Sequence, residues 1–241
     1  MKEVTLNVDG LILKGNIFAT ASAEEKQPAI LFIHGWESAQ DRMFGLAEEL
    51  SGKGYYCMTV DLRGHGISEG DHKIYSRKEF IKDVIAAYDF LVAQEQVDPS
   101  RVVAIGSSFG GYMAALLSAE RSLQGIAMRV PADYRDVGFE EPLYDQRKDW
   151  EHSQWKNNPH SNDETAALRA VHSFAGHILV VESEKDELVP TPTVRSYRDA
   201  APNPDKLSYV VMANAPHSIS RFPQFQKEFG AIVTNWLESF K

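Results

Sequence analysis

The sequence predicts an α/β fold with a mostly parallel sheet, and three observations support this prediction. Strand-like runs alternate with helix-like runs over most of the 241 residues, which is typical of parallel strands joined by covering helices. A Gly-x-Ser-x-Gly motif at residues 106–110 lies between a β-branched run and a helix-like run. Hydrophobic residues make up 43% of the chain, enough for a substantial core, and the length favours one large domain over two small ones.

The expected elements begin with an antiparallel hairpin. Val4–Val8 and Leu11–Phe18 are joined by Asp9-Gly10, a typical hairpin turn that places this pair at one edge of the sheet. The other expected strands are Ala29–Ile33, Tyr55–Val60, Arg101–Ile105, Ile126–Val130, His177–Val181 and Leu207–Met212. The expected helices cover about Asp41–Lys53, Arg77–Gln96, Gly111–Ala119 and Phe222–Phe240.

Local sequence supports these elements in order. The strands are rich in β-branched and aromatic residues. Gly52 and Gly54 are typical of a helix end, and the apolar residues of the helix from Arg77 recur at three- and four-residue spacing. Periodicity fails between Pro131 and Phe174, so we expect a short insertion there, over the carboxyl ends of the strands.

Ser108, at the centre of the motif, is a candidate nucleophile at a strand-to-helix turn. In such an elbow the serine backbone is strained, and side chains two residues to either side would collide with the strand and helix, which explains Gly106 and Gly110. The alternative is a helix start in which Ser107 or Ser108 only caps the first turn. The remainder of a hydrolytic site has to distinguish the two.

The other parts of such a site follow predicted strands. His34-Gly35-Trp36 ends the strand from Ala29, and the amides of Trp36 and Phe109 can form an oxyanion hole. A serine also needs a histidine base, which a carboxylate orients. Asp186 lies just after the strand from His177, and His217 lies after the last strand.

Together these pieces resemble the α/β-hydrolase family over nearly the whole chain. The resembling pieces are His34-Gly35-Trp36, Asp61 to Gly66, Gly106 to Gly110, Asp186 and His217. The resemblance implies an eight-stranded, mostly parallel sheet with helices on both faces and a short cap at about 131–174. The chain order Ser108, Asp186, His217 is the order found in that fold.

The resemblance also implies roles for these residues. Ser108 is then the nucleophile, His217 the general base and then acid, Asp186 its orienting carboxylate, and Trp36 and Phe109 the oxyanion donors. Within the family the chain is similar to small serine esterases of the dienelactone hydrolase and prolyl oligopeptidase-like kinds. Dienelactone hydrolases carry cysteine at the elbow, however, and prolyl oligopeptidases have a propeller domain before the catalytic part.

Several side chains compete for these roles or for substrate contacts. Glu182, Glu184 and Glu187 share the neighbourhood of Asp186, and Asp133 follows the preceding strand. The remaining candidates are expected in the substrate pocket: Arg129, Trp150 and Trp155. Arg129 would meet an anionic substrate group or pair with acids of the insertion, and the tryptophans would line the pocket or fix the insertion to the body.

Composition excludes several other classes of protein. The net charge of -9 and the lack of a basic stripe argue against nucleic-acid binding. No basic segment leads into an apolar stretch, no run has transmembrane length, and a lone Cys57 rules out an internal disulfide, so we expect a cytoplasmic protein without membrane contact. No metal or organic cofactor is implied, and the oligomeric state stays open.

The predicted function is therefore a serine hydrolase that cleaves small carboxylic esters through a Ser-His-Asp triad and an acyl-enzyme intermediate. Thioesterase and small peptidase or acylaminoacyl hydrolase activities use the same machinery and remain alternatives. A ligand-binding protein on the same fold, without turnover, is the alternative from another class.

Overall fold

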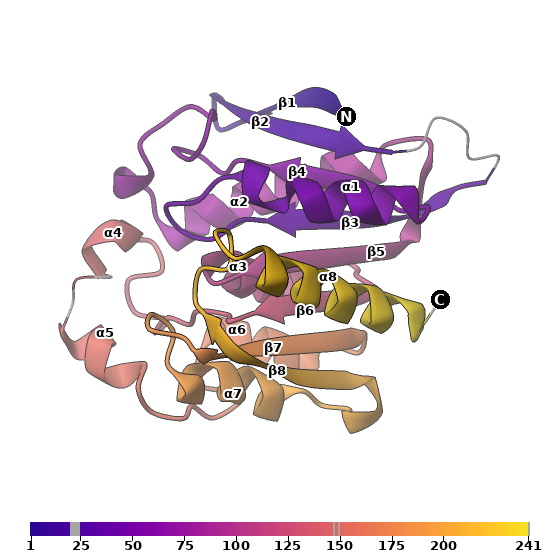
Figure 1. The fold of residues 1–241 in the computed structure, drawn as a ribbon. Helices are drawn as coiled ribbons and strands as arrows, with labels where there is room; N and C mark the ends of the chain where they lie inside the picture. The colour runs from indigo at the N-terminus through magenta and orange to yellow at the C-terminus, as the bar shows by residue number, and fades with distance from the viewer. Residues whose placement is uncertain (20–24, 147, 149, 241) are drawn as a thin grey trace.

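The computed structural model describes residues 1–19, 25–146, 148 and 150–240, and its centre is one eight-stranded sheet (Figure 1). The strands lie in the order β1-β2-β4-β3-β5-β6-β7-β8. They are β1 (Lys2–Val8), β2 (Leu11–Phe18), β3 (Gln27–Ile33), β4 (Tyr56–Val60), β5 (Val97–Ser107), β6 (Gly125–Arg129), β7 (His177–Lys185) and β8 (Leu207–Pro216). β2 pairs antiparallel with β1 and β4, and the other neighbours pair in parallel, which confirms the predicted sheet.

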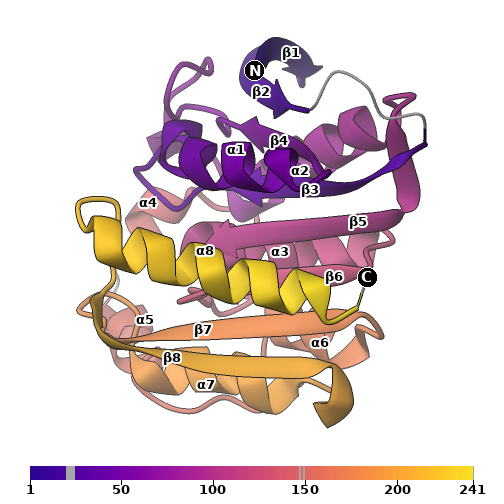
Figure 2. The ribbon, with the colours of Figure 1, turned by 45° about the vertical axis from the view of Figure 1, so that its right-hand side comes forward.

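Helices cover both faces of this sheet (Figures 1 and 2). The α-helices are α1 (Phe44–Gly52), α2 (Arg77–Val92), α3 (Phe109–Glu120), α4 (Leu143–Gln146), α5 (Trp150–Trp155), α6 (Ala166–Ser173), α7 (Thr191–Ala200) and α8 (Pro223–Glu238). Short 3-10 helices are η1 (Gln40–Met43), η2 (His72–Ile74) and η3 (Pro204–Lys206). Within the described ranges, no helix is long and apolar enough to cross a membrane.

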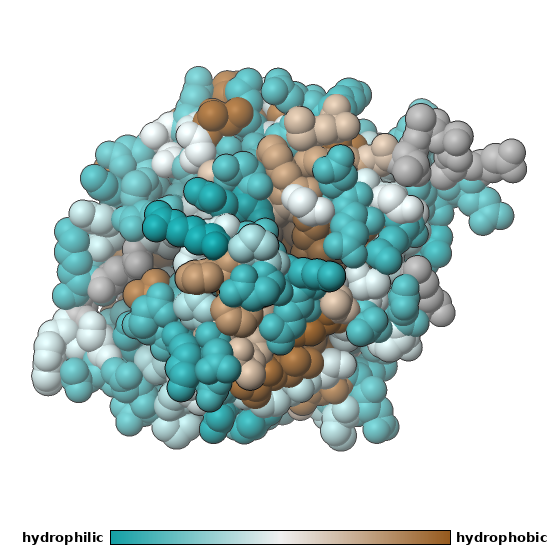
Figure 3. All heavy atoms as spheres, in the orientation of Figure 1, coloured by the Kyte–Doolittle hydropathy of each residue, from teal (hydrophilic) through white to brown (hydrophobic). Residues whose placement is uncertain are grey.

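The core has two parts, one on each face of the sheet. On one face, side chains of α2, α3, α6 and α7 pack against the strands. On the other face, α1 and α8 cover the strands, and Figures 1 and 2 show these two helices in front of the sheet. The outer surface of this second face is mostly hydrophilic, with apolar side chains exposed in scattered places (Figure 3). Alternating burial along the strands therefore distributes apolar side chains to both layers.

Strands β5, β7 and β8 are longer than the sequence predicts, and β7 ends at Lys185 instead of Val181. β5 begins at Val97 instead of Arg101, because Val97 pairs with Gln27 of β3 across an irregularity in the ladder. β8 continues to Pro216, where it pairs with Lys185 after a similar shift in register. These extensions bring strand β7 up to Asp186 and strand β8 up to His217, so both residues begin their turns directly at the end of a strand.

The segment from Pro131 to Phe174 is not uniform. Its last helix, α6, packs against α3 and α7, so it belongs to the layer that covers the sheet. The helices α4 and α5 lie beyond the carboxyl ends of the strands instead (Figure 1). α4 also packs against η2, where Tyr144 contacts His72. The part of the predicted insertion that projects over the strand ends is therefore confined to the residues before Thr165.

Candidate active site

Ser108 occupies a sharp turn between β5 and α3. Its φ of 55° and ψ of -118° lie in a region that side chains other than glycine rarely adopt, which is the strained conformation expected of an elbow. A Cβ on Gly106 would lie 2.1 Å from the carbonyl oxygen of Gly110, and a Cβ on Gly110 would lie 2.1 Å from the carbonyl oxygen of Ile33. Only glycine fits at either position, as the sequence predicts.

Backbone hydrogen bonds from the turn after β6 hold the strained residue. The Ser108 amide donates to the carbonyl of Arg129 at 2.9 Å, and the Ser108 carbonyl accepts from the Ala132 amide at 3.1 Å. Phe109 begins α3, so its amide lies in the first helical turn, where N–H groups have no acceptor within the helix itself. The elbow thus presents a serine hydroxyl beside a helix N-terminus.

The turn that carries Trp36 lies against the elbow. A Cβ on Gly35 would lie 3.2 Å from the Ser107 carbonyl oxygen and 3.5 Å from Cβ of Ser108. The Trp36 ring packs edge-on against Phe109, with ring centroids 5.4 Å apart. The backbone of residues 35 and 36 therefore borders the space next to the Ser108 side chain.

His34, the first residue of this turn, has a structural position. Its Nε2 accepts from the Leu62 amide at 3.0 Å, and its Nδ1 lies 2.7 Å from the Gly35 carbonyl oxygen. Burial lowers the pKa of this imidazole below its usual 6.5, so it stays neutral and holds the two loops together. His34 therefore has a structural role in this turn.

Asp186 and His217 form a direct pair at the ends of β7 and β8. Nδ1 of His217 lies 2.8 Å and 3.0 Å from the two carboxylate oxygens of Asp186. Oδ1 of Asp186 also accepts from the amides of Leu188 and Val189, each at 2.8 Å. Both side chains are largely buried, with 11% of His217 and 4% of Asp186 exposed. The backbone amides of its own turn therefore hold the Asp186 carboxylate in place, and the carboxylate orients the His217 ring.

The competing glutamates have other partners. Glu187 accepts from the backbone amide of His217 at 3.1 Å, and Glu184 accepts from the amide of Asn214 at 2.7 Å. Glu182 bonds Arg195 and the hydroxyl of Tyr209. Asp186 is the acid among these that reaches the imidazole. The bond from Glu187 to the His217 backbone is a feature that the sequence pattern did not reveal.

Asp133, the competitor after β6, points elsewhere. It accepts from the Tyr134 amide at 2.8 Å and from the Thr165 hydroxyl at 3.0 and 3.1 Å. Burial raises the pKa of its carboxyl group to about 7. Asp133 therefore ties the turn after β6 to the start of α6.

The structure places Ser108 and His217 after strands β5 and β8 at the same edge of the sheet, without a direct bond. Within the described part of the chain, no hydrogen bond joins the Ser108 hydroxyl to the His217 ring. Both residues instead bond Arg129, Ser108 through its amide and His217 through its carbonyl. In hydrolases without substrate this hydroxyl–imidazole contact is often long and tightens in the complex.

The three residues expected in the substrate pocket lie elsewhere. Arg129 is only 5% exposed and bonds the His217 carbonyl and the Ser183 hydroxyl, so the structure does not support pairing with acids of the insertion. Trp150 is 72% exposed on the outside of α5. Trp155 stacks on His160 at 3.8 Å between ring centroids and donates to Glu164, which fixes α5 to the rest of the insertion.

A cavity of about 520 Å³ lies within the same segment, and none of these three residues lines it. Its walls are Tyr134, Arg135, Val137, Gly138, Glu141, Pro142, Asp145, Gln146 and His152. The Tyr134 ring separates the cavity from the elbow helix, since it lies 6.2 Å from the Phe109 ring and 4.9 Å from the Tyr112 ring. Its position directly after β6 is the sequence signal that would have identified Tyr134.

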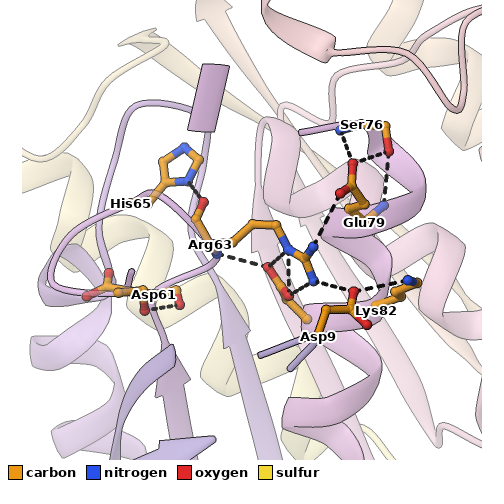
Figure 4. Close-up of polar contacts among 9 residues, drawn as sticks. Asp9, Asp61, Arg63, His65, Ser76, Glu79 and Lys82 are labelled. Carbon is orange, nitrogen blue, oxygen red and sulfur yellow. Dashed lines mark hydrogen bonds and ion pairs between the residues drawn. The ribbon is translucent and has the colours of Figure 1, made fainter. Parts of the chain in front are cut away.

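Arg63, in the loop after β4, has a structural environment (Figure 4). Its guanidinium is 1% exposed and bonds both oxygens of Asp83, with Asp9 and Glu79 also close by. Asp61 accepts from Gln40 and from the Ile67 amide. Asp61 thus bonds partly within its own loop, whereas the carboxylate partners of Arg63 lie on α2 and in the β1–β2 turn.

No cluster of metal-ligating side chains accompanies this site. Among the residues that the structure describes, no group of three or more His, Cys, Asp or Glu side chains is arranged to hold a metal ion. The free thiol of Cys57 is buried on the far layer of the core, where burial raises its pKa.

Comparisons with known proteins agree with this geometry. The profile of a family described as serine aminopeptidase, S33, matches residues 24–134, which include the Trp36 turn and the elbow. An uncharacterized protein of Mycobacterium tuberculosis is 26% identical over 212 residues, 87% of this chain and 69% of that protein. A quorum-quenching protein, AidA, of Acinetobacter baumannii is 30% identical over 46% of this chain and 37% of its own length.

Solved structures share the fold over the whole chain. Est1E of Butyrivibrio proteoclasticus, solved with ferulic acid, superposes with a TM-score of 0.72 at 16% identity, covering 98% of this chain and 99% of Est1E. The acylaminoacyl peptidase of Pyrococcus horikoshii gives a TM-score of 0.74 at 18% identity, covering 98% of this chain and 41% of the peptidase. With the sheet order and the elbow, these likenesses show that the chain has the α/β-hydrolase fold.

Proposed function

We propose that the protein is a serine hydrolase that cleaves carboxylic esters, with Ser108 as nucleophile, His217 as base and Asp186 as its partner. The observation that carries this proposal is the bond between Nδ1 of His217 and Asp186, at the ends of the second and third strands from the one that leads to the strained serine elbow. Because Nδ1 faces the carboxylate, it carries the proton, and Nε2 keeps the lone pair that a general base requires.

The reaction follows from these positions. Ser108 attacks the ester carbonyl while His217 takes the hydroxyl proton at Nε2, and the carbonyl carbon becomes tetrahedral. The imidazolium then gives the proton to the leaving alcohol, which leaves an acyl group on Ser108. Water, deprotonated by His217, attacks this acyl-enzyme and releases the acid. The amides of Trp36 and Phe109 would stabilise the negative oxygen in both steps, and each such donor typically contributes about 3 kcal/mol.

The cavity beside Tyr134 is proposed to hold part of the substrate. Its volume of about 520 Å³ lies in the range of small-molecule sites. Tyr134 and His152 stack with an interplanar angle of 6°, which gives the cavity a flat wall suited to a planar or apolar group. This position replaces the earlier assignment to Trp150 and Trp155, which lie outside the cavity lining.

The relatives point to acyl-transfer chemistry without choosing the acyl group. Est1E was solved with ferulic acid, the Pyrococcus protein is an acylaminoacyl peptidase, and a human relative is a palmitoyl-protein thioesterase. The same triad serves esters, thioesters and peptides, and pocket shape determines the selectivity. We propose the ester because its carbonyl is attacked more readily than that of an amide and because an esterase is among the solved structures that share the fold. The experiment below includes thioesters and amides.

The test measures hydrolysis of p-nitrophenyl esters of increasing acyl length by the wild type and by Ser108→Ala. Ser107→Ala is the matched control, because Ser107 is the neighbouring serine at the end of β5. The proposal expects turnover for the wild type and for Ser107→Ala, and a loss of at least about 1,000-fold for Ser108→Ala. Full activity in Ser108→Ala would refute the assignment of the nucleophile.

Two further substrates separate the alternatives. An acyl-thioester and an N-acyl amino-acid p-nitroanilide, used at matched acyl length, test for thioesterase and peptidase activity. If either is turned over faster than every ester, that activity replaces the ester hydrolase. Labelling of Ser108 by a fluorophosphonate without sustained turnover of any of the three would instead indicate a binding protein on the hydrolase fold.

A further inference from the structure

Arg129 is the one residue bonded to both Ser108 and His217 in the described part of the chain. Its carbonyl oxygen accepts from the Ser108 amide at 2.9 Å. Its side chain extends the other way, and Nη2 donates to the carbonyl oxygen of His217 at 2.5 Å. Nη1 donates to the hydroxyl of Ser183, in the strand that precedes Asp186, at 3.1 Å. One residue at the end of β6 therefore contacts the elbow, the strand that leads to Asp186 and the backbone of His217.

The backbone next to Arg129 is strained, and the strain helps to hold this arrangement. Val130 has a φ of 42°, which a β-branched residue rarely adopts, and its amide bonds the Val181 carbonyl at 2.7 Å. This sharp turn returns the chain so that the Ala132 amide reaches the Ser108 carbonyl. Strain of this kind persists where the surroundings fix it, and here it fixes both polar backbone groups of Ser108.

The guanidinium cannot serve as a substrate contact in this position, because Arg129 is only 5% exposed. Within the described ranges no carboxylate oxygen lies close enough for an ion pair with it, in contrast to Arg63, which bonds Asp83 directly. The charges that act on it come from Asp186 and Glu187, in the loop after β7. Burial lowers the pKa of Arg129 to about 10, so the side chain remains a cation at neutral pH.

We propose that Arg129 is a positioning residue of the hydrolytic site, which fixes the His217 loop against the elbow and supplies the cation that faces the Asp186 and His217 pair. The inference rests on the proposed function, because it assigns Arg129 to the same triad. The hydrogen bond from Arg129 to the His217 carbonyl oxygen sets the distance between the His217 loop and the end of β6. A displacement of about 1 Å in such a group typically costs about 100-fold in rate.

Two variants separate the hydrogen bonds from the charge. Arg129→Lys keeps a cation but loses the pair of guanidinium hydrogen bonds to Ser183 and His217, and Arg129→Met removes the charge and the hydrogen bonds. Arg101→Met is the control, since Arg101 lies exposed at the opposite end of β5. Circular dichroism and thermal unfolding establish that each variant is folded before its kinetics are compared.

The expected signature is a fall in kcat at constant KM. We expect kcat to fall about 10-fold in Arg129→Lys and about 100-fold in Arg129→Met, with KM within about twofold of the wild type, because no substrate atom is contacted.

Other outcomes overturn the inference. A raised KM with unchanged kcat would indicate that Arg129 contacts the substrate. Unchanged kcat and KM in Arg129→Met would show that Arg129 does not position His217. If Arg129→Met fails to fold, Ser183→Ala provides the test, because it removes one of the two bonds of the guanidinium. We expect Ser183→Ala to lower kcat about threefold to tenfold at constant KM, and wild-type kcat would refute the proposal.

A measurement without turnover keeps this inference separate from the proposed function. Hydrogen exchange followed by mass spectrometry reports on the loop that follows β8, whatever reaction the site performs. We expect Arg129→Met to increase exchange in residues 214–219 and to leave β1 and β2 unchanged. If the wild type does not hydrolyse esters but exchange in this loop still increases in Arg129→Met, Arg129 positions His217 and the proposed ester substrate is wrong. Unchanged exchange in the loop refutes the positioning role.

Discussion

The turns that carry Ser108, Asp186 and His217 and the segment that carries α4 and α5 are held in place in different ways. Each of the three turns begins at the end of a parallel strand, and backbone atoms make most of its hydrogen bonds. The α4–α5 segment is held by side chains instead. Arg77 donates to the carbonyls of Arg135 and Val137, and rings of α5 stack on Tyr134.

This difference separates the reaction from the choice of substrate. The place of a turn at a strand end is set mainly by the sheet, with the glycines of the elbow and the Arg129 side chain as further constraints. A segment set by side-chain contacts can change its cavity through a few substitutions while the sheet stays the same. We therefore expect substitutions in the turns to affect kcat, and substitutions in the segment to affect stability and KM.

Gly110→Ala should have the largest effect, because it acts on the turn region directly. Its Cβ would lie 2.1 Å from the Ile33 carbonyl oxygen, so the elbow has to move away from β3. We expect no activity and a poorly folded protein by circular dichroism. Gly45→Ala is the control, because Gly45 lies in helix α1 with no neighbour within 4 Å, and it should be neutral or stabilising by up to about 1 kcal/mol. An active Gly110→Ala variant would mean that the elbow is not constrained.

Asp186→Asn and Glu187→Gln compare two carboxylates that contact the same histidine. Asp186 bonds the ring and Glu187 bonds the backbone amide. We expect kcat to fall about 1,000-fold to 10,000-fold in Asp186→Asn, because the wrong tautomer is favoured, and less than about 10-fold in Glu187→Gln. Steady-state kinetics at one pH suffices. Equal effects of the two substitutions would show that the acid has been assigned to the wrong carboxylate.

Asp133→Asn tests how the turn before the α4–α5 segment is stabilised, through the pH dependence of the free energy of unfolding. The pKa of Asp133 is raised in the folded state from 3.8 to about 7, so the folded protein binds this proton more tightly than the unfolded chain. Stability from this group is present below pH 4 and is lost as the pH rises to about 7, by at most about 1.4 kcal/mol per pH unit.

The expected result for Asp133→Asn is a smaller loss of stability between pH 5 and pH 8 than in the wild type, measured by urea unfolding. An asparagine can still accept from the Tyr134 amide and the Thr165 hydroxyl, so the fold is retained. Glu140→Gln, at an exposed carboxylate of the same segment, is the control and should keep the wild-type dependence on pH. Identical curves for the wild type and Asp133→Asn would contradict the buried-carboxyl account.

Trp155→Ala should have the smallest of these effects. It removes the stack on His160 and the bond to Glu164, and we expect a loss of about 1–3 kcal/mol in stability, with KM changed more than kcat. Trp150→Ala is the matched control, since this exposed tryptophan of the same helix should be neutral. A larger loss in Trp150→Ala, or a kcat effect in Trp155→Ala as large as that of Asp186→Asn, would remove the distinction between the two regions.

The sequence predicted the positions of the turns that carry Ser108, Asp186 and His217 better than the contacts of the α4–α5 segment. Alternating strands and helices, the two glycines around Ser108 and the strand-end positions of Asp186 and His217 depend on local patterns that a single sequence displays. The roles of Arg129, Trp150 and Trp155 depend on which distant side chains they meet. The bond from Arg129 to the His217 carbonyl joins residues 88 positions apart, and no local pattern encodes it.

The same reason explains the other differences. β5 begins early because Val97 pairs with Gln27, a distant residue, and Tyr134 lines the cavity because His152 stacks on it. The carboxylate partners of Arg63 lie on α2 and in the β1–β2 turn, both distant from Arg63 in the sequence (Figure 4). Contacts between segments far apart in the chain require the folded structure.

The most direct test of the central claim is mass spectrometry of the protein during turnover of p-nitrophenyl acetate, with rapid acid quenching and peptide mapping. The account predicts an acetyl group on Ser108 that accumulates with the release of p-nitrophenol and disappears when the substrate is exhausted. In Asp186→Asn the group should form more slowly. An acetyl group on another residue, or turnover without any acyl-enzyme in a rapid-quench series, would contradict the account.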